Sequence, residues 1–149
     1  MSETMNEKKR VKTQDALSVY NVLKSLKIAK LSKADQFAVL RAARALKPVA
    51  IGFEDFVKDT QERLKPEGFD GVIEKSQRFN TLSDEEKRAV NEAATAYQRD
   101  VDECVKPELD SVKEVDCFEP LSQDALSGIA SANEHLDVQT LMLIEDVCG

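Results

Sequence analysis

The sequence predicts a mainly α protein, an antiparallel helical bundle with a small C-terminal α or αβ element. The 149 residues include only five Gly and four Pro, whereas helix-favouring Ala, Leu, Lys, Glu and Gln are plentiful. Apolar residues also recur at intervals of three and four over long stretches, which is the spacing of one helix face. Hydrophobic residues make up 42% of the chain, enough for a core, and the length fits one domain.

The first twelve residues are predicted to form a flexible basic arm, and residues 13–149 a single helical domain. The arm carries Lys8, Lys9, Arg10 and Lys12 with almost nothing to bury. Within the domain we expect a main bundle over 13–107 and the C-terminal element over 108–149. The bundle begins with a helix over 14–27, because Thr13 can cap it and apolar residues follow at helical spacing.

A second helix is expected over 33–64, where apolar residues form the clearest stripe of the chain. Pro48 interrupts this stripe, so a kink or a split is expected near Lys47. A third helix is expected over 84–105, since Ser83 and Glu86 form a capping box and Pro107 follows. The predicted core places the second helix (Leu40, Leu46, Phe53, Val57, Leu64) against residues of the first and third (Leu23, Val90, Ala93, Tyr97, Val101).

The last third of the chain changes character. Val115 to Phe118 could form a short strand, and a short helix is expected to follow Ser122. Asp137 can cap a final helix, for which we predict four inward-facing residues: Val138, Leu141, Met142 and Ile144.

No recognised catalytic or metal-binding pattern is present. The three cysteines and the single histidine lie at 104, 117, 148 and 135, without the paired spacing of zinc sites. A dyad of a cysteine with His135 would also need an orienting group and a pocket. We therefore expect three free thiols, no cofactor, no metal and no enzymatic activity.

Charge is divided unevenly along the chain. Residues 1–47 carry a net charge of +7 and residues 48–149 a net charge of −14. Such polarity suggests a protein partner or self-association, although it is also compatible with a merely solvated bundle.

Direct nucleic-acid binding is less favoured, because no aromatic pair accompanies the basic residues. No apolar run reaches the roughly 18 residues of a spanning helix, so no membrane contact is expected. The candidate interaction residues form a basic set (Lys24, Lys27, Lys30, Arg41, Arg44) and an acidic set (Asp100, Asp102, Glu103, Glu108, Asp110).

The stretch from Leu17 to Leu64, with its short Lys27–Leu31 link and its Lys47-Pro48 step, resembles small uncharacterised helical proteins of tailed phages and prophages. The resemblance implies an accessory protein of virion, neck or tail assembly that acts by binding protein. The three unpaired cysteines favour a location in the cytoplasm, here that of a host cell, and the resemblance adds the virion. The alternative function is an acidic anti-defence inhibitor that binds a host nucleic-acid-binding protein.

Overall fold

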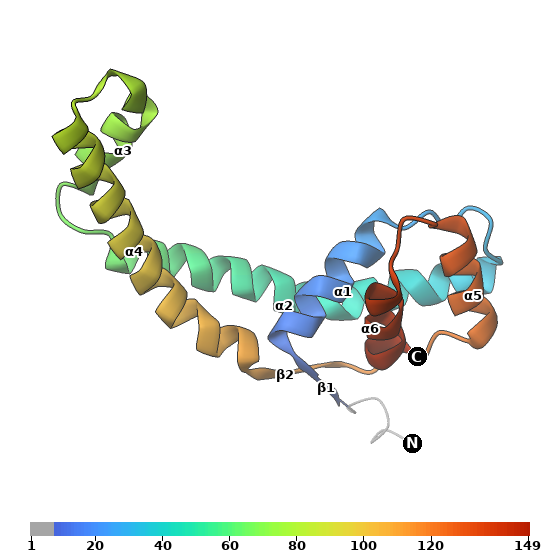
Figure 1. The fold of residues 1–149 in the computed structure, drawn as a ribbon. Coiled ribbons are helices and arrows are strands. Elements are labelled where there is room, and N and C mark those ends of the chain that lie inside the picture. The colour runs from blue at the N-terminus through green and yellow to red at the C-terminus, as the bar shows by residue number, and fades with distance from the viewer. Residues whose placement is uncertain (1–7) are drawn as a thin grey trace. The chain divides into compact units, whose positions relative to one another are not determined.

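The structure is a computed structural model that describes residues 8–149, and it is mainly α, as predicted (Figure 1). A small antiparallel two-stranded sheet accompanies the helices. The elements in chain order are β1 (Lys8–Lys12), α1 (Thr13–Ser25), α2 (Lys33–Leu64), α3 (Phe69–Gln77), the 3-10 turn η2 (Phe79–Thr81), α4 (Asp84–Asp110), β2 (Val112–Asp116), α5 (Gln123–Ala132) and α6 (Val138–Cys148). None of the helices within residues 8–149 is long and apolar enough to cross a membrane.

The described residues group into two compact units. Unit 1 includes residues 8–53 and 109–149, and unit 2 comprises residues 54–108. This grouping differs from the expected division between 107 and 108, because the C-terminal element shares its core with α1 and the first part of α2. That core consists of buried residues from both strands, α1, the first part of α2, the link before α5, α5 and α6: Val11, Ala16, Val19, Leu23, Ala38, Val39, Ala42, Leu46, Val115, Leu121, Ala125, Ile129, Ile144, Val147 and Cys148.

The sheet corrects the prediction of a flexible arm. Residues 8–12 form β1, which pairs with β2 so that Lys8 lies opposite Asp116 and Lys12 opposite Val112. Val11 is buried while its neighbours in the strand are more exposed, as expected for a strand with one face on a core. Residues 1–7 of the predicted arm lie outside the described residues. The predicted strand at 115–118 is displaced, since β2 starts at Val112 and ends at Asp116.

The buried side of α2 differs from the predicted one. Four small or aliphatic residues of α2 lie in the unit 1 core: Ala38, Val39, Ala42 and Leu46. Leu46 shares that core with Leu23, as expected. In contrast, Leu40 is 45% exposed and Phe37 is 54% exposed. At about 100° per residue, Phe37 and Leu40 lie on roughly the opposite side of the helix from the buried residues.

Both internal prolines lie within continuous helices, so α2 has the predicted bounds of 33–64 without a split, whereas the predicted end of the third helix at 105 is wrong. Helix α2 is assigned without a break from Lys33 to Leu64 although it contains Pro48. Helix α4 likewise extends through Pro107 to Asp110 rather than ending at 105. Each proline removes one backbone donor at a cost of about 3 kcal/mol. Both side chains are exposed, and buried residues occur on both sides of each proline, so packing on either side offsets that cost.

Unit 2 joins the second part of α2, α3 and most of α4. The Tyr97 hydroxyl donates a hydrogen bond to the Gln61 carbonyl at 2.7 Å. The Tyr97 ring also lies 4.6 Å from the Phe69 ring. Val90 and Val101 are buried, as predicted for the inner face of α4. The capping box at the start of α4 is confirmed: Ser83 Oγ accepts from the Glu86 N–H at 3.2 Å.

Candidate functional site

Local hydrogen bonds fix both ends of the helix pair α5–α6. Ser122 Oγ accepts from the Ala125 N–H at 3.0 Å and caps α5. Asp137 accepts from the Thr140 N–H at 2.8 Å and caps α6, as predicted. Hydrogen bonds from Thr140 lower the pKa of Asp137. The Leu121 N–H, just before α5, donates to the carbonyl of Cys148 at the end of α6. Because both helices are anchored, the surface between them has a defined form.

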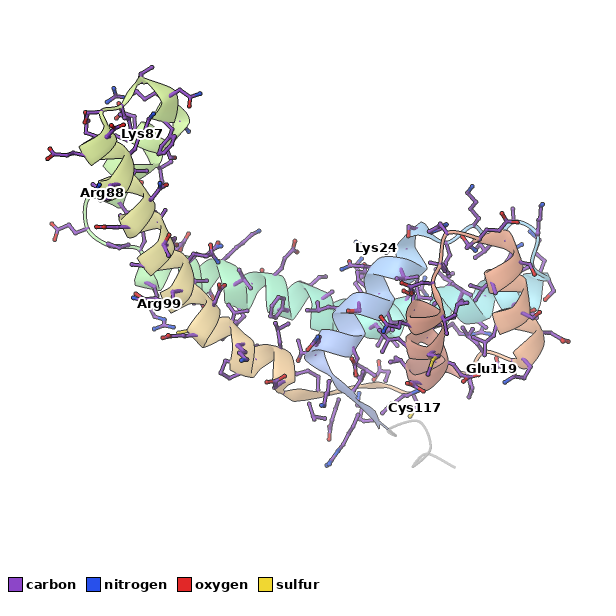
Figure 2. The ribbon with its side chains drawn as sticks, viewed as in Figure 1. Lys24, Lys87, Arg88, Arg99, Cys117 and Glu119 are labelled. Atoms are coloured by element: carbon purple, nitrogen blue, oxygen red, sulfur yellow. The ribbon has the colours of Figure 1, made fainter. Side chains whose placement is uncertain are left out.

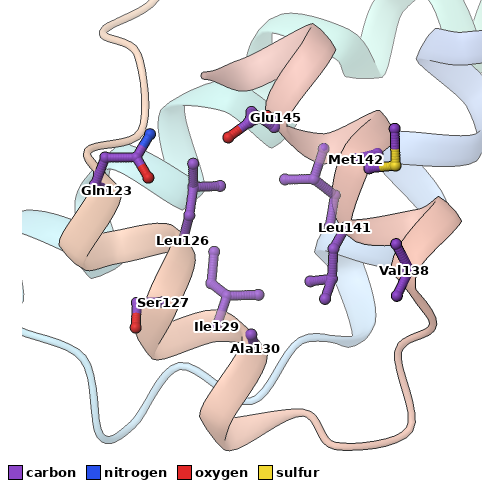
Figure 3. A pocket seen from close by; sticks show the side chains of 10 residues that line it. Gln123, Leu126, Ser127, Ile129, Ala130, Val138, Leu141, Met142 and Glu145 are labelled. Carbon is purple, nitrogen blue, oxygen red and sulfur yellow. The ribbon is translucent and has the colours of Figure 1, made fainter.

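That surface is an apolar groove of about 290 Å³. Figure 3 shows Leu126 and Ile129 of α5 on one side and Leu141 of α6 on the other. Three polar side chains also line it: Gln123, Ser127 and Glu145. We call this surface the α5–α6 groove.

Two apolar residues that line the groove are exposed, which corrects the prediction that they pack inward. Val138 is 71% exposed and Met142 is 58% exposed, whereas Ile144 of the same helix is 1% exposed. Val138 and Met142 are one turn apart, so they lie on the same side of α6. Neighbouring exposed apolar side chains around an apolar concavity are typical of a protein-binding surface.

The segment that carries the groove contains acidic residues and no Lys or Arg, and two of these acids pair with cations of unit 1: Asp116 with Lys8 and Glu119 with Arg41. Residues 114–149 contain no Lys or Arg and eight acidic residues: Glu114, Asp116, Glu119, Asp124, Glu134, Asp137, Glu145 and Asp146. Glu145 itself lines the groove. A partner that places cations around an apolar contact would therefore match both properties of this surface.

A second concavity, of about 680 Å³, lies between the α1–α2 link and the α5–α6 link. Lys27 and Lys30 line it together with Glu134 and His135. The two links are joined by the buried amide of Asn133, which accepts from the Lys27 N–H at 2.8 Å and donates to the Lys27 carbonyl at 3.1 Å. The same amide nitrogen donates to the Ile129 carbonyl at 3.0 Å. We call this arrangement the Asn133 clamp.

The predicted basic residues all lie in unit 1, but only Lys27 and Lys30 line the same concavity. Lys24 lies on α1, where its ammonium is 4.9 Å from the centre of the Tyr20 ring (Figure 2). Arg41 pairs with Glu119 at 3.1 Å. Arg44 is exposed on α2.

The predicted acidic residues do not form a uniformly negative surface. Asp100, Asp102 and Glu103 are exposed on α4 in unit 2, whereas Asp110 belongs to unit 1. Arg99 lies 4.0 Å from Asp100, and a shallow hollow on α4 is lined by Asp102 and Glu103 together with Arg99 and Lys106. Glu108 is half-buried at the end of unit 2. Arg99 and Lys106 therefore lie among the predicted acidic residues of α4.

The cysteines show no arrangement for nucleophilic chemistry. Burial raises the pKa of the Cys148 thiol to about 11, so it stays protonated at neutral pH. Cys104 contacts Arg63, with 4.0 Å between Sγ and Nη2, and Cys117 is exposed. His135 lines the concavity beside the Asn133 clamp, and no cysteine is among the described residues that line it. Within residues 8–149, no group of three or more His, Cys, Asp and Glu is placed to hold a metal ion.

Comparisons with family models, with curated proteins and with solved structures give no match to this chain. The site is therefore interpreted from its own geometry.

Sequence reasoning missed the α5–α6 groove because Val138 and Met142 share helical spacing with residues that are buried. One signal was present: α6 has apolar residues at 138, 141, 142, 143, 144 and 147, which is more than one face of a helix can hold. Such an excess indicates a helix with a second apolar surface.

Proposed function

We propose that this protein is a non-enzymatic interaction factor that binds another protein through the α5–α6 groove. The observation that supports the proposal is the pair of exposed apolar side chains, Val138 and Met142, that line an apolar groove. Burying side chains of this size in an interface contributes about 1.5–3 kcal/mol each. The capped, core-anchored helices present them without prior rearrangement, which lowers the cost of binding.

The resemblance to small tailed-phage proteins favours an accessory role in virion, neck or tail assembly. A second candidate is an acidic inhibitor of a host nucleic-acid-binding protein. It is supported by the run of residues 114–149, which holds eight acids and no Lys or Arg. The two functions differ in the class of the partner.

The experiment compares the native chain with Met142→Lys as affinity baits in extracts of phage-infected or lysogenic cells. We expect that the native chain captures a specific protein and that Met142→Lys does not. The introduced cation repels a basic partner, and the substitution also removes part of the apolar surface. A captured virion component supports the assembly role. A captured nucleic-acid-binding protein that added DNA displaces supports the inhibitor role.

Val112→Lys provides the matched control. Val112 lies in β2 and is 57% exposed, close to the 58% of Met142, and it does not line the groove. This variant should capture the same proteins as the native chain. If Met142→Lys and Val112→Lys behave alike, while both keep the helical circular dichroism of the native chain, the groove is not the binding site.

A further inference from the structure

An amphipathic surface on α2 has no partner within the described part of the chain. Its residues follow one another at steps of four and three, so they lie along one side of the helix. All six are exposed: Lys33, Phe37, Leu40, Arg44, Lys47 and Ile51. We call this surface the basic α2 face.

The charge of the basic α2 face is opposite to that of the α5–α6 groove. The basic α2 face holds three cations, Lys33, Arg44 and Lys47, and no acid, whereas residues 114–149 hold eight acids and no Lys or Arg. Both surfaces also have large exposed apolar side chains, Phe37, Leu40 and Ile51 on one and Val138 and Met142 on the other. An apolar helix face flanked by cations is the ligand that an acidic, apolar groove accepts.

The two surfaces cannot meet within one molecule. Ala42 and Leu46 of α2 pack into the same core as Ile129 of α5 and Ile144 of α6. The basic α2 face lies on the other side of α2 and points away from that core. A contact between the face and the groove must therefore join two copies.

We infer that the α5–α6 groove of one copy binds the basic α2 face of a second copy, in a contact between unlike surfaces. This inference rests on the proposed function, because it names a second copy of the chain as the occupant of the same groove. Contacts between unlike surfaces close into rings or continue as chains, depending on the rotation between copies. Such self-association is consistent with an assembly role.

The test measures the mass of the purified full-length chain by sedimentation as its concentration rises to the solubility limit. The native chain should show a mass that increases with concentration and decreases with added salt. Leu40→Glu alters the basic α2 face, and Met142→Lys alters the groove. Each variant alone should bind itself at least about tenfold more weakly, since each loses one apolar contact and gains a repelling charge.

Mixing the two variants provides the decisive measurement. The Met142→Lys copy keeps an intact α2 face, and the Leu40→Glu copy keeps an intact groove. The mixture should therefore form a mixed complex that neither variant forms by itself. Ile73→Glu and Val112→Lys are the matched controls, because Ile73 is 40% exposed and Val112 is 57% exposed outside both surfaces. Both controls should associate like the native chain.

Three results would overturn the inference: a native chain that remains monomeric at every concentration, a control that weakens association as much as its matched variant, or a mixture that does not associate. The last result would indicate a contact between like surfaces. These failures are distinct from failure of the proposed function. A monomeric chain that still loses a foreign partner on Met142→Lys leaves the groove as a binding site and excludes only the second copy as its occupant.

Discussion

Asn133 holds the α1–α2 link and the α5–α6 link together. Its side chain is 1% exposed and makes three hydrogen bonds, two to the backbone of Lys27 and one to the Ile129 carbonyl. We predict that Asn133→Ala lowers the free energy of unfolding by about 1–3 kcal/mol, because it leaves the Lys27 backbone groups without these partners. Urea denaturation followed by circular dichroism measures the loss.

Two further variants define the role of the clamp. Glu134→Ala alters the exposed neighbour and should change the unfolding free energy by less than about 0.5 kcal/mol. Asn133→Asp keeps an oxygen that can accept from the Lys27 N–H. It replaces the amide nitrogen, which donates to the Lys27 and Ile129 carbonyls, with a second oxygen that cannot donate, so this variant should also lower the free energy of unfolding. If Asn133→Ala costs no more than Glu134→Ala, the amide does not hold the links together.

Because of Cys148, the free energy of unfolding should decrease at alkaline pH. Burial raises the pKa of its thiol from 9.0 to about 11, while the nearby Lys9 ammonium acts in the opposite direction. The unfolded chain releases this proton first, so the contribution is intact below pH 9 and is lost as the pH rises toward 11. The loss amounts to about 2–3 kcal/mol at most, at about 1.4 kcal/mol per pKa unit.

The measurement compares the pH dependence of the unfolding free energy in the native chain and in Cys148→Ala. The native chain should lose stability more steeply between pH 9 and pH 11. Every other titratable group is common to the two proteins, so the difference in slope isolates the thiol. Equal slopes would contradict a buried, protonated Cys148.

At the scale of elements, α2 has two apolar stripes and buries only one of them. Leu46 is fully buried in the unit 1 core, whereas Leu40 is 45% exposed on the basic α2 face. We predict that Leu46→Ala lowers the unfolding free energy by about 2–5 kcal/mol, because it leaves a cavity. Leu40→Ala should cost less than about 1 kcal/mol, since most of that side chain is already hydrated. Denaturant melts of both variants test the assignment, and equal losses would contradict it.

The helices were predictable from the sequence to the extent that local signals determine them. The caps predicted at Ser83 and Asp137 depend on neighbouring residues and are found where the sequence indicates them. The cap predicted at Thr13 is wrong, because α1 begins at Thr13 and has no side-chain cap. Strand β1 was missed because its partner, β2, lies about a hundred residues further along the chain. The predicted buried side of α2 was wrong because two small residues, Ala38 and Ala42, form much of the side that is buried. Larger apolar residues on the opposite side had indicated that the core lay there.

At the scale of the whole chain, the sequence predicted one basic and one acidic set of interaction residues, and the structure brings only part of each set together. Lys27 and Lys30 do share a concavity, and Arg44 belongs to the basic α2 face. Neighbouring Arg99 and Lys106 reduce the expected acidity of α4, and this balance depends on which side of a helix each charge occupies. The excess of apolar residues on α6 indicated a second apolar surface, but the form of the α5–α6 groove could not be predicted, because it arises from the packing of two helices against a core built from distant segments.

The two compact units differ in how much apolar surface they bury, and this difference predicts their relative stability. Unit 1 has a core of fifteen buried hydrophobic residues, whereas four hydrophobic residues are buried in unit 2: Phe69, Leu82, Val90 and Val101. Segments with few buried apolar contacts open at lower free energy. We therefore predict that backbone amides in 54–108 exchange with deuterium faster than those of α1, α5 and α6.

Hydrogen exchange followed by mass spectrometry measures this difference directly, and two core variants assign it. Val101→Ala should accelerate exchange in unit 2 and leave α1 and α6 protected, because its missing methyl groups lie outside the unit 1 core. Leu46→Ala should accelerate exchange in α1, α5 and α6, which pack on the core that contains Leu46. If either variant accelerates exchange equally throughout residues 8–149, the chain opens as one cooperative unit, and the lower stability assigned to unit 2 would be wrong.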